Sequence, residues 1–216
     1  MLLQRLQALI ENIYDVDSLG SVADFLVTDR RALGAEVPAH SDEQLLVAVD
    51  VSDNSLAMSL FLDAAVIRRL GDADPVADLH SGNIADYLTV LEGVSHFVCV
   101  AWHAQHDRPV SLMNLEMQAE IDKYVATTSL MRVQSPERFP AELHRLLFAR
   151  AHVAPQLARG RERLYGAASQ HAAKFCQRIE RRLRALWRRP DVTRMPELCR
   201  LYRMPDVEKL AYIAAL

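Results

Sequence analysis

The sequence predicts a mainly α-helical protein, a helical bundle of about six to nine helices with a single β-hairpin near residues 44–62. Three observations predict this class. Apolar residues recur at intervals of three and four along most of the 216-residue chain, which is the period of helices with one buried face. Only residues 44–62 alternate with the period of a strand. Glycine and proline residues separate the periodic segments, as they do at helix ends.

The first forty residues predict two helices and a loop. We expect the first helix over residues 2–14, because apolar residues lie there at helical spacing: Leu3, Leu6, Ile10 and Ile13. Ser21 can cap a short second helix that runs through Phe25 and Leu26, since a serine side chain accepts a hydrogen bond from a free N–H at a helix start. Residues 34–41 are expected to form a loop.

The predicted hairpin has one apolar face. In each half every second residue is apolar: Leu45, Val47, Val49 and Val51, then Leu56, Met58, Leu60 and Leu62. A lone hairpin is only marginally stable in water. Its apolar face must therefore pack on helices, or its edge must pair with another chain. We expect it to pack on the helices.

Seven further helices are expected after the hairpin. Asp63 caps the first, which Gly71 ends, and Pro109 is expected in the first turn of the third. Their approximate ranges are 64–70, 83–104, 109–131, 141–151, 160–187, 195–202 and 206–214. The helix over 160–187 carries a narrow apolar seam formed by Ala168, Ala172, Phe175, Ile179, Leu183 and Leu186. Such a seam packs along another helix, in this chain or in a dimer partner.

The chain is expected to form a single domain, residues 1–216, with an uneven distribution of charge. Residues 1–144 contain 9 Lys/Arg and 22 Asp/Glu, whereas residues 145–216 contain 16 Lys/Arg and 6 Asp/Glu. The acidic part holds the hairpin and the central helices, and the basic part is helical. This split indicates either an anionic partner for the basic part or attraction between the two parts.

Several classes of protein are not indicated by the sequence. It contains no GxxxxGK[ST], GxGxxG or GxSxG motif, so no nucleotide, other cofactor or hydrolase chemistry is predicted. No uninterrupted apolar run reaches about 18 residues, and the N-terminus has an amphipathic pattern, so neither a transmembrane segment nor a signal peptide is expected. The cysteines, Cys99, Cys176 and Cys199, are odd in number and far apart, which favours a reduced, cytoplasmic protein.

The two helices around residue 107 carry the candidate chemistry. Helical phase places Glu92, His96, Cys99 and His103 on one flank of the first helix, and Glu116, Glu120 and Lys123 on one flank of the second. An antiparallel arrangement about the tight link at residues 106–109 would set Glu92 near Lys123, His96 near Glu120, and Cys99 near Glu116.

Three interpretations of these flanks remain open. The simplest is a structural network, because charges on a buried helix must be paired. The second is a metal site formed by Glu92, His96, Glu116 and Glu120, since bundle metal sites combine carboxylates and imidazoles from facing helices. Its spacing departs from Glu-x-x-His, and Lys123 would oppose a cation. The third is a pocket for a small polar ligand with His96 or Glu120 as the catalytic acid or base.

A basic segment over residues 178–189 is a separate candidate. It offers a row of guanidinium groups for phosphates or other anions: Arg178, Arg181, Arg184, Arg188 and Arg189. The simplest interpretation is a solvated face that neutralises the acidic part. Nucleic acid, an acidic protein or an anionic membrane surface are alternatives, although no helix-turn-helix or zinc-finger pattern surrounds the segment.

Together these observations favour a non-catalytic cytoplasmic interaction or regulatory protein, with a protein partner or self-association. An enzyme, or a protein that binds a metal or small ligand on the Glu/His flank, is the first alternative. Nucleic-acid binding through residues 178–189 is the second.

Overall fold

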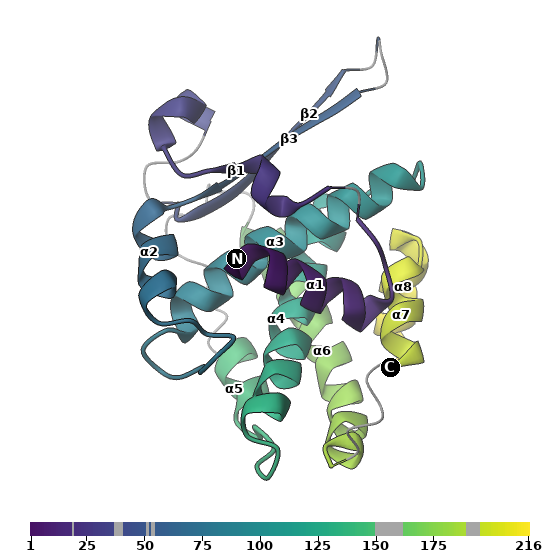
Figure 1. Ribbon diagram of the computed structural model, residues 1–216. Helices are drawn as coiled ribbons and strands as arrows, with labels where there is room; N and C mark the ends of the chain where they lie inside the picture. Colours follow the sequence, from purple (N-terminus) through teal and green to yellow (C-terminus); the bar gives the residue numbers. More distant parts are fainter. Residues whose placement is uncertain (19, 37–40, 51, 53–54, 150–161, 189–194) are drawn as a thin grey trace. The chain divides into compact units, whose positions relative to one another are not determined.

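The computed structural model describes residues 1–18, 20–36, 41–50, 52, 55–149, 162–188 and 195–216 (Figure 1). It confirms the mainly α class, since 66% of it is helical and the described residues form eight α-helices with a small three-stranded sheet. The chain divides into two compact units, residues 1–11 with 17–109 and residues 12–16 with 110–216. The single domain predicted over residues 1–216 stays a prediction.

The uneven charge is also present in this division, although the contrast is smaller than at the predicted boundary at residue 144, where the net charges of the two parts are −13 and +10. The first unit contains 6 Lys/Arg and 16 Asp/Glu, a net charge of −10. The second contains 19 Lys/Arg and 12 Asp/Glu, a net charge of +7. Each unit is therefore strongly charged, with opposite sign.

The first unit combines the sheet with helices. Its elements are α1 (Leu2–Tyr14, whose last turn belongs to the second unit), the 3-10 helices η1 (Val22–Phe25) and η2 (Arg30–Glu36), the strands β1 (Leu26–Val27), β2 (Glu43–Asp50) and β3 (Ser55–Leu62), and the helices α2 (Ala64–Asp72) and α3 (Ile84–Gln105). The predicted caps are present: Ser21 accepts a hydrogen bond from the Ala23 N–H at 3.3 Å, and Asp63 accepts one from the Ala65 N–H at 2.7 Å.

The sheet contains the predicted hairpin and one further strand. β2 and β3 are antiparallel, with Leu45 opposite Leu60 and Val49 opposite Leu56. β1 pairs in parallel with β3 through Leu26 and Val27, so the strand order is β1-β3-β2. β1 was not predicted, because a strand of two residues is too short to show a period in the sequence.

Helix α3 lies against the base of the hairpin at a glycine. A Cβ atom placed on Gly93 would lie 2.8 Å from Leu60 Cδ1 and 2.9 Å from Glu43 Cγ. Both distances are shorter than carbon atoms tolerate, so a side chain at this position would force the Leu60 and Glu43 side chains to shift. Gly93 therefore sets how closely β2 and β3 approach α3.

Only the base of the hairpin is buried. Leu60, Phe61 and Leu62 are inaccessible to solvent, whereas Val47 is 45% exposed and Val49 66% exposed. In Figure 1 the paired strands continue well past β1. The prediction that the apolar face packs on helices therefore needs correction for its distal half, where no helix of the described first unit covers these two valines.

Helix α3 has the length and apolar composition of a membrane-spanning helix, and it is the one described helix that does. About two thirds of its most apolar stretch is buried within the structure, 67% by residue, and a core helix has the same property. The expected absence of a transmembrane segment stays a prediction.

The second unit is all helical in its described residues. It consists of α4 (Leu112–Gln134), α5 (Leu143–Phe148), α6 (Glu162–Leu186), α7 (Pro196–Arg203) and α8 (Asp206–Ala214), with the last turn of α1. Pro109 precedes α4 instead of lying in its first turn. The helix begins after Ser111, whose hydroxyl accepts a hydrogen bond from the Asn114 N–H at 3.1 Å and so supplies the cap.

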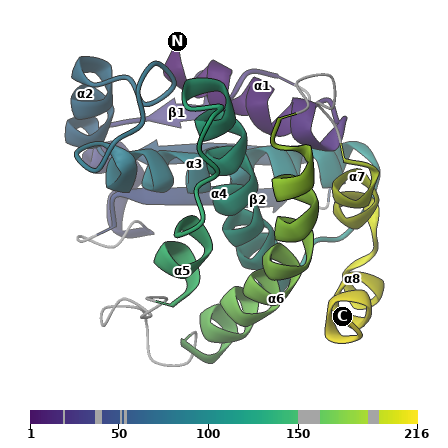
Figure 2. The same ribbon diagram turned by 90° about the horizontal axis from the view of Figure 1, so that it is seen from below.

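The seam on α6 packs along α4, and the two helices lie side by side in both views (Figures 1 and 2). Ala168, Ala172, Phe175 and Ile179 are buried. The sequence left open whether this seam meets a helix of the same chain or of a dimer partner. The structure shows that α4 covers it.

We expect Gly93→Ala to destabilise the protein by about 1–3 kcal/mol, the usual cost of overpacking a well-packed core. The added methyl group would collide with Leu60 and Glu43, which outweighs the gain in helix propensity. Urea unfolding monitored by circular dichroism measures the change in free energy of unfolding.

Gly71→Ala in α2 is the matched control, because a Cβ atom there has no neighbour within 4 Å. It should stabilise the protein by about 0.5–1 kcal/mol, the difference in helix propensity between the two residues. If Gly93→Ala were as stabilising as Gly71→Ala, the close approach of the hairpin to α3 would be disproved.

Candidate functional site

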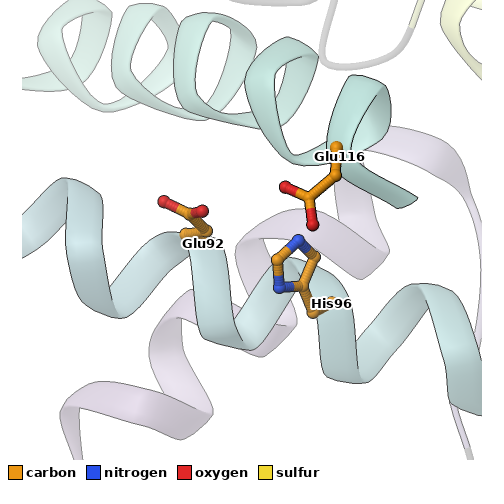
Figure 3. A group of neighbouring side chains, drawn as sticks. All are labelled: Glu92, His96 and Glu116. Atoms are coloured by element: carbon orange, nitrogen blue, oxygen red, sulfur yellow. The ribbon is translucent and has the colours of Figure 1, made fainter. Parts of the chain in front are cut away.

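The predicted polar flank of α3 is present in the first unit. Glu92 and His96 lie one turn apart and their side chains extend from the same side of the helix (Figure 3). Each offers one atom that could bind a metal ion, and these two atoms lie within 4.8 Å of each other. His96 is buried and Glu92 is half-buried.

A third group of this flank, Glu43, comes from β2 and was missed by the sequence analysis. Its Oε1 lies 3.5 Å from Nδ1 of His96, and both side chains are largely buried. Gly93 allows the strand to bring this carboxylate to α3. Glu43 lies two residues before Leu45, and alternate residues of a strand lie on the same face. A predicted strand that began at Glu43 instead of Leu45 would therefore have placed this carboxylate on the helix-facing side.

Cys99 and His103 do not form a nucleophile and base. Nδ1 of His103 lies 2.8 Å from the Cys99 carbonyl oxygen, one turn earlier in the same helix, and 3.6 Å from the Cys99 sulfur. Both side chains are buried, at 1% and 3% exposure. A reactive thiol needs access for its substrate. This pair is therefore best described as part of the helix interior.

The predicted flank of α4 lies in the second unit. Nζ of Lys123 donates a hydrogen bond to Oε1 of Glu120 at 2.7 Å, three residues away on the same helix. Glu116, also drawn in Figure 3, is buried at 8% exposure. The three predicted pairs across the link, and the metal set that adds Glu116 and Glu120 to Glu92 and His96, join residues of both units and stay predictions.

The second unit contains a buried polar network that the sequence analysis did not identify. The Asp122 carboxylate accepts hydrogen bonds from the Tyr14 hydroxyl and from Nε2 of Gln118, the latter at 2.8 Å. Nζ of Lys209 lies 3.5 Å from Oε1 of Gln118 and 5.8 Å from the ring centre of Tyr202. All five side chains are at most 1% exposed. The network joins α1, α4, α7 and α8.

Burial gives two groups near this network strongly perturbed pKa values. The pKa of the Tyr14 hydroxyl lies well above its ordinary value of 10.0, because the side chain is buried and Asp122 is negatively charged beside it. The pKa of the Cys176 thiol is also raised well above 9.0, by burial and then by the carboxylates of Glu120, Asp122 and Glu180. Both groups are therefore neutral near pH 7, and Cys176 is not a nucleophile.

The arginine residues of α6 separate into two groups. Arg184 donates two hydrogen bonds to Oε1 of Glu180, at 2.9 and 2.7 Å, and its guanidinium carbon lies 4.4 Å from the ring centre of Phe139. It is thus held by the fold. Arg178 and Arg181 are exposed and line two surface hollows. Arg188 is exposed as well, and Arg189 lies outside the described residues.

No protein-family model matches the sequence, and neither the curated proteins nor the solved structures yield a match.

We expect the free energy of unfolding to fall as the pH rises above about 9, by about 1.4 kcal/mol per pH unit for each group that stays protonated only in the folded state. Folding raises the pKa of Cys176 and of Tyr14, so each contribution to stability is present below the ordinary pKa and is lost above it. Urea unfolding at a series of pH values measures the slope.

Cys176→Ala should reduce the slope that begins near pH 9, and Tyr14→Phe the part that begins near pH 10, as their ordinary pKa values require. Cys199→Ala, which removes a half-buried thiol elsewhere in the same unit, is the control for the loss of a cysteine. An unchanged slope in Cys176→Ala would contradict the burial of this thiol.

Proposed function

We propose that this protein is a non-catalytic interaction protein, and that the distal half of its β2–β3 hairpin binds an extended, basic segment of a partner protein. The observation that carries the proposal is the exposure of Val47 and Val49, 45% and 66%, on a strand at the edge of the sheet. A protein rarely leaves adjacent apolar side chains exposed beside an open strand edge without using them.

The strand edge supports an added strand as the mode of binding. β2 pairs with β3 on one side, and no described strand lies on its other side. Backbone N–H and C=O groups along such an edge can pair with an extended peptide, while alternate side chains supply specificity. Val47 and Val49 lie on one face, opposite Met58 and Leu56 of β3, so they continue the apolar face of the base.

The charge of the hairpin supports a basic partner. Residues 42–63 contain five Asp/Glu and no Lys, Arg or His, and the whole first unit has a net charge of −10. A second copy of this strand would bring like charges together, which destabilises strand pairing. A segment that alternates basic and apolar residues matches both the acidic surroundings and the exposed valines.

A peptide of about eight alternating Lys and Val residues, the length of a typical strand, is a suitable probe. We expect it to bind the parent protein, and the double variant Val47→Arg/Val49→Arg to bind it at least about tenfold more weakly, a loss of about 1.4 kcal/mol. Fluorescence anisotropy with a labelled peptide gives the dissociation constants.

Val133→Arg is the matched control, because Val133 is an isolated valine on α4 that is 81% exposed. The Val133→Arg variant should have the same affinity for the peptide and the same stability as the parent protein. Hydrogen exchange should show protection of the β2 amide groups when the peptide is bound. The proposal would be refuted if the double variant bound the Lys-Val peptide as tightly as the parent does. It would also be refuted if the parent bound a Glu-Val peptide of the same length equally tightly.

A divalent metal ion on the flank of α3 is a second candidate. The observation that favours it is the pair of possible ligand atoms from Glu92 and His96 within 4.8 Å, with the Glu43 carboxylate 3.5 Å from His96. Imidazole and carboxylate ligands suit Zn²⁺ and similar ions.

Metal content tests this second candidate. Protein purified without chelator should contain a stoichiometric ion, which Glu92→Gln and His96→Gln should each remove. His171→Gln on α6 is the control for a general loss of histidine and should retain the ion. Parent protein that contains no metal and is not stabilised by added Zn²⁺ or Mn²⁺ would exclude this candidate.

A further inference from the structure

The second unit carries a concave cationic surface, which we define by Lys174, Arg178, Arg181 and Arg182 of α6 and Arg200 of α7. Two hollows, of about 440 and 490 Å³, form this surface. Arg178 and Arg181 line both hollows, so the two are adjacent. Their volumes are in the range of pockets for small molecules, about 300–1,000 Å³.

Some of these cations are already engaged within the fold. Arg182 donates a hydrogen bond to Glu197, and the same carboxylate accepts one from the Tyr212 hydroxyl at 3.0 Å. Nζ of Lys174 donates to the Ala214 carbonyl oxygen at 2.7 Å. These contacts hold α6, α7 and α8 around the hollows. They also neutralise Glu197, which would otherwise repel an anion.

Three guanidinium groups remain available. Arg178, Arg181 and Arg200 are exposed and form no ion pair with any residue that the structure describes. Arg200 lies beside Tyr212, with its guanidinium carbon 6.0 Å from the ring centre. Arg178, Arg200 and Tyr212 line the same hollow.

This arrangement opposes the stability of α6 itself. Lys174 and Arg178 are four residues apart, as are Arg178 and Arg182, and Arg178 and Arg181 are three apart. Like charges at these spacings lie next to each other on the helix surface and destabilise it. An anion bound between them would convert this repulsion into attraction.

We propose that the cationic surface binds a small organic phosphate with at least two phosphate groups, such as a nucleoside diphosphate, with the phosphates against Arg178 and Arg181, where the two hollows meet. Guanidinium groups bind phosphate oxygens through two parallel hydrogen bonds, so Arg178 and Arg181 between the hollows can contact both phosphates. Arg200 of α7 lines one of these hollows and adds a third guanidinium group to the site.

The structure favours a small phosphate over a nucleic acid. A polynucleotide needs a continuous row of cations along its backbone. The predicted row on α6 is interrupted, because Arg184 is paired with Glu180 and stacked on Phe139. Glu197 lines one hollow and Glu180 the other, so carboxylates further interrupt the row of cations that a polynucleotide would need.

Titration calorimetry at low ionic strength tests the proposal with inorganic pyrophosphate and with ADP as probes. Both should bind at least about tenfold more tightly than inorganic phosphate or sulfate, because each carries a second phosphate group, with further negative charge, for the guanidinium groups. Binding of pyrophosphate should raise the unfolding temperature of the protein.

Arg178→Gln/Arg181→Gln should weaken pyrophosphate binding by at least about tenfold, since it removes the two cations common to both hollows. Both side chains are exposed, so the variant should keep the circular dichroism spectrum of the parent, and it should be at least as stable because repulsion along α6 is reduced. Arg163→Gln changes the charge of the same helix outside both hollows, and it should alter the affinity by less than about twofold.

Three results would overturn the proposal. The first is no heat of binding and no stabilisation with pyrophosphate. The second is equal affinity in the double variant and in Arg163→Gln, which would indicate nonspecific attraction to the basic unit. The third is tighter binding of a single-stranded oligonucleotide than of pyrophosphate, weakened by Arg188→Gln, which would identify a nucleic-acid surface instead.

Discussion

Helix α3 is apolar on nearly its whole circumference, and the architecture of the first unit follows from the need to cover it. A helix of this kind must be packed on several sides. The strands β2 and β3, helix α2 and η1 all contact it, and the ring of Phe25 in η1 lies 5.0 Å from that of Phe97. Gly93 admits the strands to close range. The hairpin is buried only where α3 lies beneath it, which leaves its distal half exposed.

The second unit is characterised by polar groups buried in its interior. Tyr14, Gln118, Asp122 and Lys209 come from three helices and have almost no exposure. Each would cost several kcal/mol if buried alone, so their mutual hydrogen bonds are a condition of the packing. By contrast, the arginine residues of α6 stay at the surface. The unit therefore has two sets of polar residues. One set is hydrogen-bonded within the interior, and the other consists of exposed cations on α6.

The sequence predicted what local periods encode and missed what only tertiary contacts create. The helix over residues 2–14, the hairpin and the cap at Asp63 follow from spacing and side-chain chemistry within a few residues. β1 depends on β3, and the position of Glu43 beside His96 depends on Gly93. Lys209 lies one turn before the buried Ile213, yet lysine is normally exposed, so nothing local indicated its burial. Arg178 and Arg181 were predicted as anion contacts. The hollows that they line could not be predicted, because residues of other helices complete them.

The residues of the buried network are synthesised at widely separated times. Tyr14 is synthesised long before Asp122, and Lys209 later still, yet all three belong to one interior. During translation the last turn of α1 must wait, with an aromatic side chain exposed, until α4 and then α8 have left the ribosome. The first unit needs nothing beyond residue 109 for its own internal contacts. The order of synthesis therefore favours completion of the sheet-containing unit first, with the second unit the more exposed to a chaperone or a protease.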